Sequence, residues 1–213
     1  MKRDPLLAQE WPASRVRRCL RKKDKKSLVQ FLRDRHQERF FKPIRKLKSS
    51  PGNIQGYGFA MMALCSLLVE TIQSYRDGLP TTGGRELAHF RTLKNVPSPY
   101  RIPAGLTAGG KKAFRRFFRS NRSHFPGLGG ARFYMNIRNG LLHQGQTKGA
   151  WTVWKQGSRV FDAKQKRIFR DDFAEALEAT FKVYLATLQK RAWRSGLWTN
   201  AARKIWWLIR LSV

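Results

Sequence analysis

The feature that most constrains the fold is a long apolar segment, residues 56–75. Read as a helix, this segment has no polar face, and a helix that is apolar all round has to be buried by other elements. It therefore predicts the central helix of a bundle, ended by Asp77 and Gly78. Its longest apolar run, residues 59–69, is about half of the ~20 residues that cross a bilayer, so we expect no membrane span.

The other periodic segments complete a mainly α fold, an up-and-down helical bundle. Helices are predicted from Ser27 to near Pro43 and over residues 111–123, 131–143, 171–190 and 200–211. Short strands over 151–154, 159–161 and 167–169 form a small β element after the 131–143 helix. Residues 49–53 predict a turn, and residues 78–110, with repeated Gly and Pro, predict a stretch that is mostly loop.

Changes in composition divide the chain into three parts. We expect a basic helical N-terminal extension over residues 1–50, the bundle over residues 51–192, and a Trp-rich basic helix over residues 193–213. The C-terminal helix is expected to pack against the bundle. One alternative is that the aromatic and basic residues of the Trp193–Trp207 tail stack on bases and neutralise phosphate. Another is that Trp206 and Trp207, which have basic neighbours, place the helix on a membrane surface.

The charge of the chain indicates a polyanionic partner. Its 213 residues include 44 Lys+Arg and 13 Asp+Glu, a formal net charge of +31. Such a charge repels itself unless it meets RNA, DNA or an anionic membrane surface, which we favour over a merely solubilising face. With 41% hydrophobic residues, the chain is too apolar for a disordered basic tail. It begins without the apolar stretch of a secretory signal, which predicts a cytoplasmic protein.

No metal or cofactor is expected. Residues 87–161 contain no Asp or Glu, so this stretch lacks the ligands of a magnesium site. Cys19 and Cys65 are the only cysteines and form no CxxC pair, which excludes a disulfide framework and a cysteine zinc site. The sequence also has no HExxH motif and no Gly-rich phosphate loop.

The acid-free stretch contains basic side chains interleaved with phenylalanines, which predicts nucleic-acid contacts. The phenylalanines at positions 114, 117 and 118 either stack on bases or form core, with the cations turned toward RNA. The predicted nucleic-acid-binding residues are Lys111, Lys112, Arg115, Arg116, Arg119, Arg122 and Arg132.

Arg138, Asn139 and His143 are the candidate catalytic residues. Asn139 and His143 are four residues apart, so they share one helix face, and Arg138 flanks that face. Histidine can act as the base or acid when a ribose 2′-OH attacks its own phosphate. A guanidinium can grip that phosphate. The alternative is a helix-terminal histidine bonded to a carbonyl.

Glu70 and Tyr134 are predicted to support this site. Glu70 lies in the apolar 56–75 segment, and a buried acid needs a cationic partner such as Arg138. The alternative is a structural salt bridge inside the bundle with no part in catalysis.

The segment Arg138-Asn139-Gly140-Leu141-Leu142-His143 resembles the RNxxxH signature of the HEPN superfamily, many of whose members are metal-independent ribonucleases. The resemblance extends over roughly residues 55–190. It includes the hydrophobic helix ending Leu68-Val69-Glu70-Thr71-Ile72 and the segment Thr147-Lys148-Gly149-Ala150-Trp151. It implies a HEPN-type bundle, usually dimeric, with Arg138, Asn139 and His143 at the catalytic cleft. Some members only bind or serve as scaffolds.

We therefore expect a metal-independent endoribonuclease that cleaves RNA through the 2′-OH. The resemblance implies a toxin or an antiphage defence effector as its setting, with an antitoxin or other regulatory protein as a further partner. A homodimer would bring a second histidine to the phosphate, with Phe133, Tyr134 and Ile137 as an apolar rim. The alternatives are a non-catalytic RNA- or DNA-binding protein and a membrane-surface protein.

Overall fold

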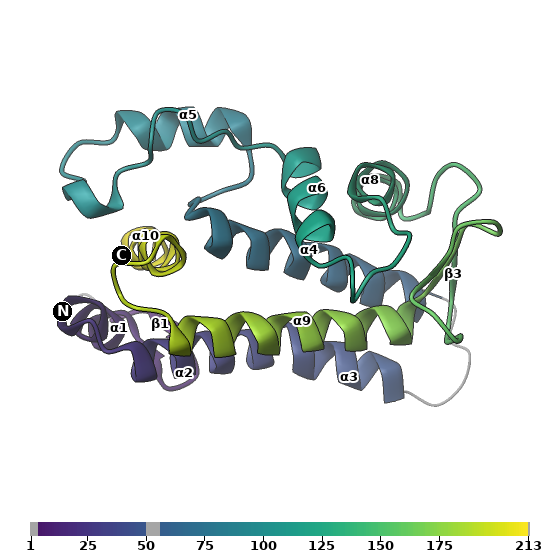
Figure 1. The fold of residues 1–213 in the computed structure, drawn as a ribbon, viewed down its shortest axis with the longest axis horizontal. Helices are drawn as coiled ribbons and strands as arrows, with labels where there is room; N and C mark the ends of the chain where they lie inside the picture. Colours follow the sequence, from purple (N-terminus) through teal and green to yellow (C-terminus); the bar gives the residue numbers. More distant parts are fainter. Residues whose placement is uncertain (1–3, 50–55, 213) are drawn as a thin grey trace. The chain divides into compact units, whose positions relative to one another are not determined.

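The computed structural model describes residues 4–49 and 56–212, which form two compact units. Unit 1 comprises Met1–Arg39, Ser74–Gly109 and Val183–Val213, and unit 2 comprises Phe40–Gln73 and Gly110–Lys182. Parts of the predicted N-terminal extension and the C-terminal helix thus share one unit. The fold is mainly α with two small sheets, as the sequence predicts (Figure 1).

Unit 2 contains α3 (Lys42–Ser49), α6 (Gly110–Ser120), α7 (Gly130–Phe133), the π-helical turn η3 (Tyr134–Arg138) and α8 (Asn139–Gln144). It also contains most of α4 (Tyr57–Asp77) and the first part of α9 (Arg170–Lys190). Phenylalanine rings from these helices fill its core, and those of Phe133 and Phe173 stack at 5.2 Å between centroids. Each such ring removes a large apolar area from water, so the cluster contributes strongly to the stability of this unit.

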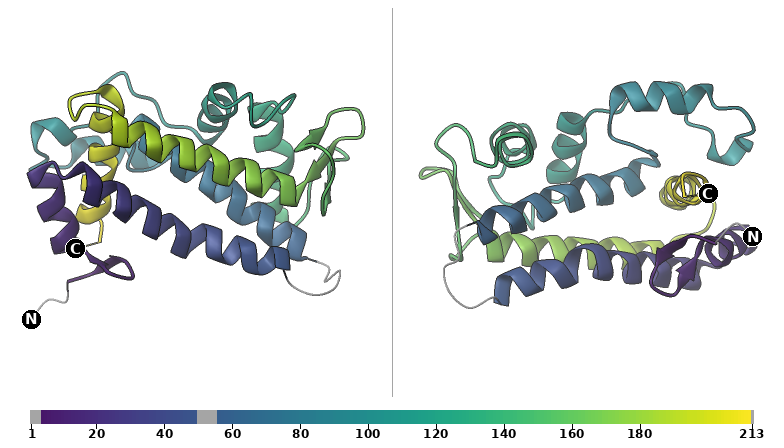
Figure 2. Two further views of the ribbon diagram at one scale, coloured as in Figure 1. Left: turned by 60° about the horizontal axis from the view of Figure 1, so that its bottom comes forward. Right: turned by 180° about the vertical axis from the view of Figure 1, so that it is seen from behind.

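A three-stranded sheet follows α8 in unit 2, as the sequence predicts. Its strands are β3 (Thr152–Trp154), β4 (Phe161–Asp162) and β5 (Arg167–Phe169), in the order β3-β5-β4. The central strand β5 pairs parallel with β3 and antiparallel with β4. The sheet lies at the N-terminal end of α9 (Figure 2).

Unit 1 contains β1 (Leu6–Ala8), β2 (Trp11–Pro12), α1 (Ala13–Lys22), α2 (Lys25–His36), α5 (Gly84–Thr92), η2 (Ser98–Tyr100) and α10 (Gly196–Arg210). The C-terminal tryptophans Trp198 and Trp207 are almost completely buried. The Trp198 indole donates a hydrogen bond to the Leu188 carbonyl at 2.7 Å. The tail thus packs into the core of its unit.

Several predicted boundaries are wrong. The helix predicted from Ser27 corresponds to α2, which begins at Lys25. The Asp24 side chain caps α2 by accepting a hydrogen bond from the Ser27 amide at 3.0 Å. Helical structure also continues beyond Pro43 into α3. Pro43 is tolerated because the π-helical turn η1 (Gln37–Phe41) has already interrupted the regular backbone hydrogen bonds at this point.

The region predicted as mostly loop contains α5 and η2, and α1 and the β1–β2 pair were not predicted. β1, β2 and η2 are too short to show a clear period. α1 does carry one, since its buried residues Ala13, Val16 and Leu20 recur at helical spacing among basic residues. Of the predicted turn at 49–53, only Ser49 lies within the described residues, where it ends α3.

Among the described residues, α4 is the one helix long and apolar enough to cross a membrane by length and composition. Its most apolar window is 56% buried inside the structure. Core helices of folded proteins meet the same criterion, so the finding is weak evidence for a span.

Candidate active site

The predicted catalytic residues Arg138, Asn139 and His143 lie on one helical segment of unit 2 formed by α7, η3 and α8. Phe133, Ile137 and Leu141 recur every four residues along it and are buried, which holds this side of the segment in the core. The segment ends at Gly145, whose φ of +65° is a left-handed conformation that favours glycine. The end at Gly145 places His143 in the last helical turn.

Gly140, inside the Arg138–His143 segment, is required by a close backbone approach. A Cβ at this position would collide with the carbonyl oxygen of Gln146. The chain after the helix therefore folds back onto it, and the Lys148 amide donates a hydrogen bond to the Asn136 carbonyl at 2.8 Å. This return fixes the end of the helix that carries His143.

Arg138 is held in place from two sides. Its Nε lies 2.7 Å from Oε1 of Glu70 on α4, and both side chains are largely buried, with 19% and 11% of their surface exposed. The guanidinium carbon also lies 5.5 Å from the centre of the Tyr134 ring. An ion pair with little solvent and a cation–π contact together fix the orientation of the guanidinium. Both predicted supporting residues thus contact Arg138.

The free edge of the guanidinium reaches the other two candidate residues. Arg138 Nη1 donates to Oδ1 of Asn139 at 3.3 Å and lies 3.4 Å from Nε2 of His143. The second contact is a hydrogen bond when Nε2 carries no proton and Nδ1 does. His143 is exposed at the surface, whereas Asn139 and Arg138 are half-buried. Arg138 thus reaches the face shared by Asn139 and His143, although helix geometry alone places it to one side.

Chemically, this set combines an exposed imidazole, an adjacent amide and an anchored cation. The imidazole can accept and return a proton, and the guanidinium can stabilise negative charge on a phosphate.

Within residues 4–49 and 56–212, no three His, Cys, Asp or Glu side chains gather as a metal site would require.

The predicted nucleic-acid-binding residues lie on and after α6. The phenylalanines of this helix have at most 2% of their surface exposed, so they are core and offer no face to a base. Arg116 is half-buried, and the other six predicted residues are exposed, namely Lys111, Lys112, Arg115, Arg119, Arg122 and Arg132. The helix therefore presents cations without aromatic surface, which suits phosphate groups.

The apolar rim predicted for a dimer is wrong in two of its three residues. Phe133 and Ile137 are completely buried in the core of unit 2, and Tyr134 is half-buried. The large apolar side chains that this helix exposes are Met135 and Leu142, at 46% and 36% of their surface. They lie on either side of Asn139, whose amide contacts the Met135 sulfur at 4.0 Å. The sequence pattern does not single them out, because apolar residues surround the helix on several sides.

Of the other histidines, His36 is sealed inside unit 1, where burial lowers its pKa to about 3. It stays neutral at physiological pH and has no access to a substrate. His89 is exposed on α5, and His124 is half-buried after α6. Both lie outside the contacts around Arg138.

Comparison with family models, with curated proteins and with solved structures found no match to this chain.

Proposed function

We propose that this chain is a metal-independent, HEPN-like endoribonuclease that cleaves RNA through attack by the ribose 2′-OH. The observation that carries the proposal is the cluster of Glu70, Arg138, Asn139 and His143, in which a buried carboxylate aims a guanidinium at an exposed imidazole. A purely structural salt bridge has no need of a histidine and an amide at its open edge.

In the proposed reaction, His143 Nε2 accepts the proton of the 2′-OH. The 2′-oxygen then forms a bond to phosphorus, and the bond between phosphorus and the 5′-oxygen breaks. The leaving 5′-oxygen takes up a proton, which gives a 2′,3′-cyclic phosphate and a 5′-hydroxyl. Arg138 binds the non-bridging phosphate oxygens and stabilises the charge of the transition state. Asn139 orients the ribose or the imidazole.

The leaving oxygen needs an acid as well as the base, and each chain supplies one histidine to this cluster. We therefore propose a homodimer in which two Arg138–His143 segments face one phosphate, with Met135 and Leu142 as the apolar contact. One His143 takes the proton of the 2′-OH, and the protonated His143 of the partner subunit gives a proton to the leaving 5′-oxygen. Two chains of +31 repel each other, so association should strengthen with salt as the charges are screened. Sedimentation at rising salt concentration should show a dimer. A strict monomer that still cleaves RNA would contradict the shared site.

Incubation with RNA tests the reaction directly. The purified protein should cut single-stranded RNA equally well with and without EDTA, because no step in the proposal uses a metal ion. The products should carry 2′,3′-cyclic phosphate and 5′-hydroxyl ends, which end-specific labelling distinguishes. The same sequence made with 2′-deoxyribose should remain intact. Cleavage of the deoxy strand, or complete inhibition by EDTA, would exclude the 2′-OH mechanism.

A second candidate is a non-catalytic nucleic-acid-binding protein. It is favoured by the exposed cations on and after α6, which no acid in residues 87–161 offsets. Such a protein would bind RNA and DNA and release both at high salt, and it would leave RNA uncut at any protein concentration.

A further inference from the structure

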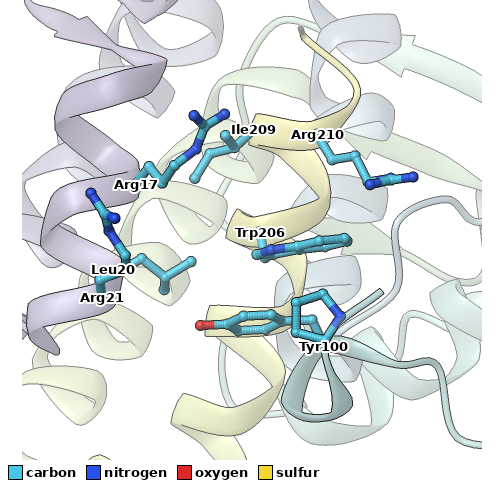
Figure 3. Close-up of a pocket in the computed structure, with 8 residues that line it drawn as sticks. Arg17, Leu20, Arg21, Tyr100, Trp206, Ile209 and Arg210 are labelled. Atoms are coloured by element: carbon cyan, nitrogen blue, oxygen red, sulfur yellow. The ribbon is translucent and has the colours of Figure 1, made fainter. Parts of the chain in front are cut away.

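A pocket in unit 1, remote in sequence from the Arg138 cluster, has its own chemistry. Its volume is about 580 Å³, within the range of small-molecule sites, and its walls are α1, α10 and the η2 segment. Figure 3 shows arginines projecting from α1 and two aromatic rings on the opposite wall. The residues that line this pocket include Arg17, Arg21, Tyr100, Trp206, Ile209 and Arg210.

The aromatic wall is built from two parallel rings. Tyr100 and Trp206 stack with their planes 11° apart and their centroids 5.4 Å apart. The Tyr100 carbonyl also accepts a hydrogen bond from the buried Trp207 indole at 3.1 Å, which ties η2 to α10. Both rings are only half-buried. Tyr100 covers one face of the Trp206 ring and the Arg210 guanidinium lies over the ring as well, so a ligand in the pocket meets the stacked pair at its edge. A rigid aromatic edge of this kind can contact a flat aromatic group edge to face.

The remaining polar lining is entirely cationic. Arg17 and Arg21 are four residues apart on α1, so their exposed side chains are neighbours on one face. Arg210 adds a third guanidinium, whose carbon lies 5.5 Å from the centre of the Trp206 ring. No acidic residue lines the pocket, and in the described part of the chain no carboxylate forms a salt bridge with any of the three. Arg210 donates a hydrogen bond to the Lys94 carbonyl at 3.3 Å, whereas an anion bound beside Arg17 and Arg21 would relieve the repulsion between those two side chains.

We propose that this pocket binds a nucleotide, with the base against the Tyr100–Trp206 wall and the phosphate held by Arg17 and Arg21. A phosphate alone would leave the aromatic wall unused, and an uncharged aromatic molecule would leave the arginines unused. The nucleotide is either free or one unit of a single strand. None of these pocket residues belongs to the proposed RNA-cleavage site, so the pocket can bind a nucleotide whether or not the chain cleaves RNA.

Binding of AMP and of a short single-stranded deoxyadenosine oligonucleotide, measured by calorimetry, tests the proposal. The oligonucleotide lacks the 2′-OH and therefore survives any ribonuclease activity. Arg17→Gln/Arg21→Gln should weaken binding by roughly tenfold or more, since charge-assisted hydrogen bonds to the phosphate are lost. The matched control is Arg18→Gln/Lys22→Gln, two exposed cations of α1 that do not line the pocket. It removes the same charge and should weaken binding by less than about threefold.

Trp206→Leu separates base recognition from anion binding. The variant should weaken AMP binding by roughly fivefold or more, because the aromatic contact with the base is lost, and it should leave ribose 5-phosphate binding unaffected. Thermal unfolding of each variant shows whether it is folded. If Trp206→Leu does not fold, the comparison of Arg17→Gln/Arg21→Gln with its control still tests the proposal. Binding of AMP identifies a free nucleotide as a ligand, and binding of the oligonucleotide alone identifies a strand. Equal losses in the two α1 pairs, or ribose 5-phosphate binding as tightly as AMP, would overturn the proposal.

Discussion

His143→Ala is expected to lower the rate of RNA cleavage by about 10²- to 10⁴-fold, the usual contribution of a general base or acid. RNA affinity should change little, because the exposed cations on and after α6 are untouched. Stability should also change little, since the side chain is exposed and its hydrogen bond in the described structure is the 3.4 Å contact with Arg138. The measurements are single-turnover cleavage, RNA binding and thermal unfolding of the same preparation.

The matched control is His89→Ala, which removes an exposed histidine from α5 in unit 1. This variant should cut RNA at the wild-type rate. If His143→Ala also cuts at that rate, His143 has no catalytic role and the proposed reaction is wrong. A parallel loss of cleavage in both variants would indicate a general effect on the preparation instead.

Arg138→Met is expected to destabilise the protein by about 3–5 kcal/mol, because the Glu70 carboxylate loses its guanidinium in a site with little solvent. Glu70→Leu should cost a similar amount, since it leaves the half-buried cation without its anion. The double variant Glu70→Leu/Arg138→Met removes both charges and keeps the volume. Its unfolding free energy should lie within about 1–2 kcal/mol of the wild type. Urea unfolding of the four proteins gives the coupling energy directly.

Cleavage should respond differently from stability. The double variant is expected to be as inactive as Arg138→Met, because a well-packed apolar pair cannot bind the phosphate. Arg45→Met is the control for the loss of one arginine in the same unit. Arg45 pairs with Glu178 at 3.4 Å, but 49% of its side chain is exposed, so its loss should cost at most about 1 kcal/mol. An Arg138→Met variant as stable as Arg45→Met would contradict a buried, anchoring ion pair.

The parts of the fold that the sequence predicted well are those with a long, regular pattern. α4 is apolar nearly all round over many turns, and α9 keeps an apolar stripe at helical spacing over a similar length. The short strands after α8 are separated by clear turn residues. α1 and α5 are shorter, and the π-helical turns η1 and η3 have no sequence signature of their own. Such turns arise where tertiary packing outweighs the regular hydrogen bonds, here before Pro43 and before Asn139.

The sequence by itself determined the mainly α class, the positive charge, and the placing of Asn139 and His143 on one helix face, because these depend on composition and local period. Only the tertiary structure decided which cation pairs with Glu70, since that contact joins positions 68 residues apart in the chain. It also decided that Phe133 and Ile137 are core while Met135 and Leu142 are exposed. The pocket between α1, η2 and α10 likewise required the fold, because periodicity describes one element at a time and a pocket depends on the packing of several.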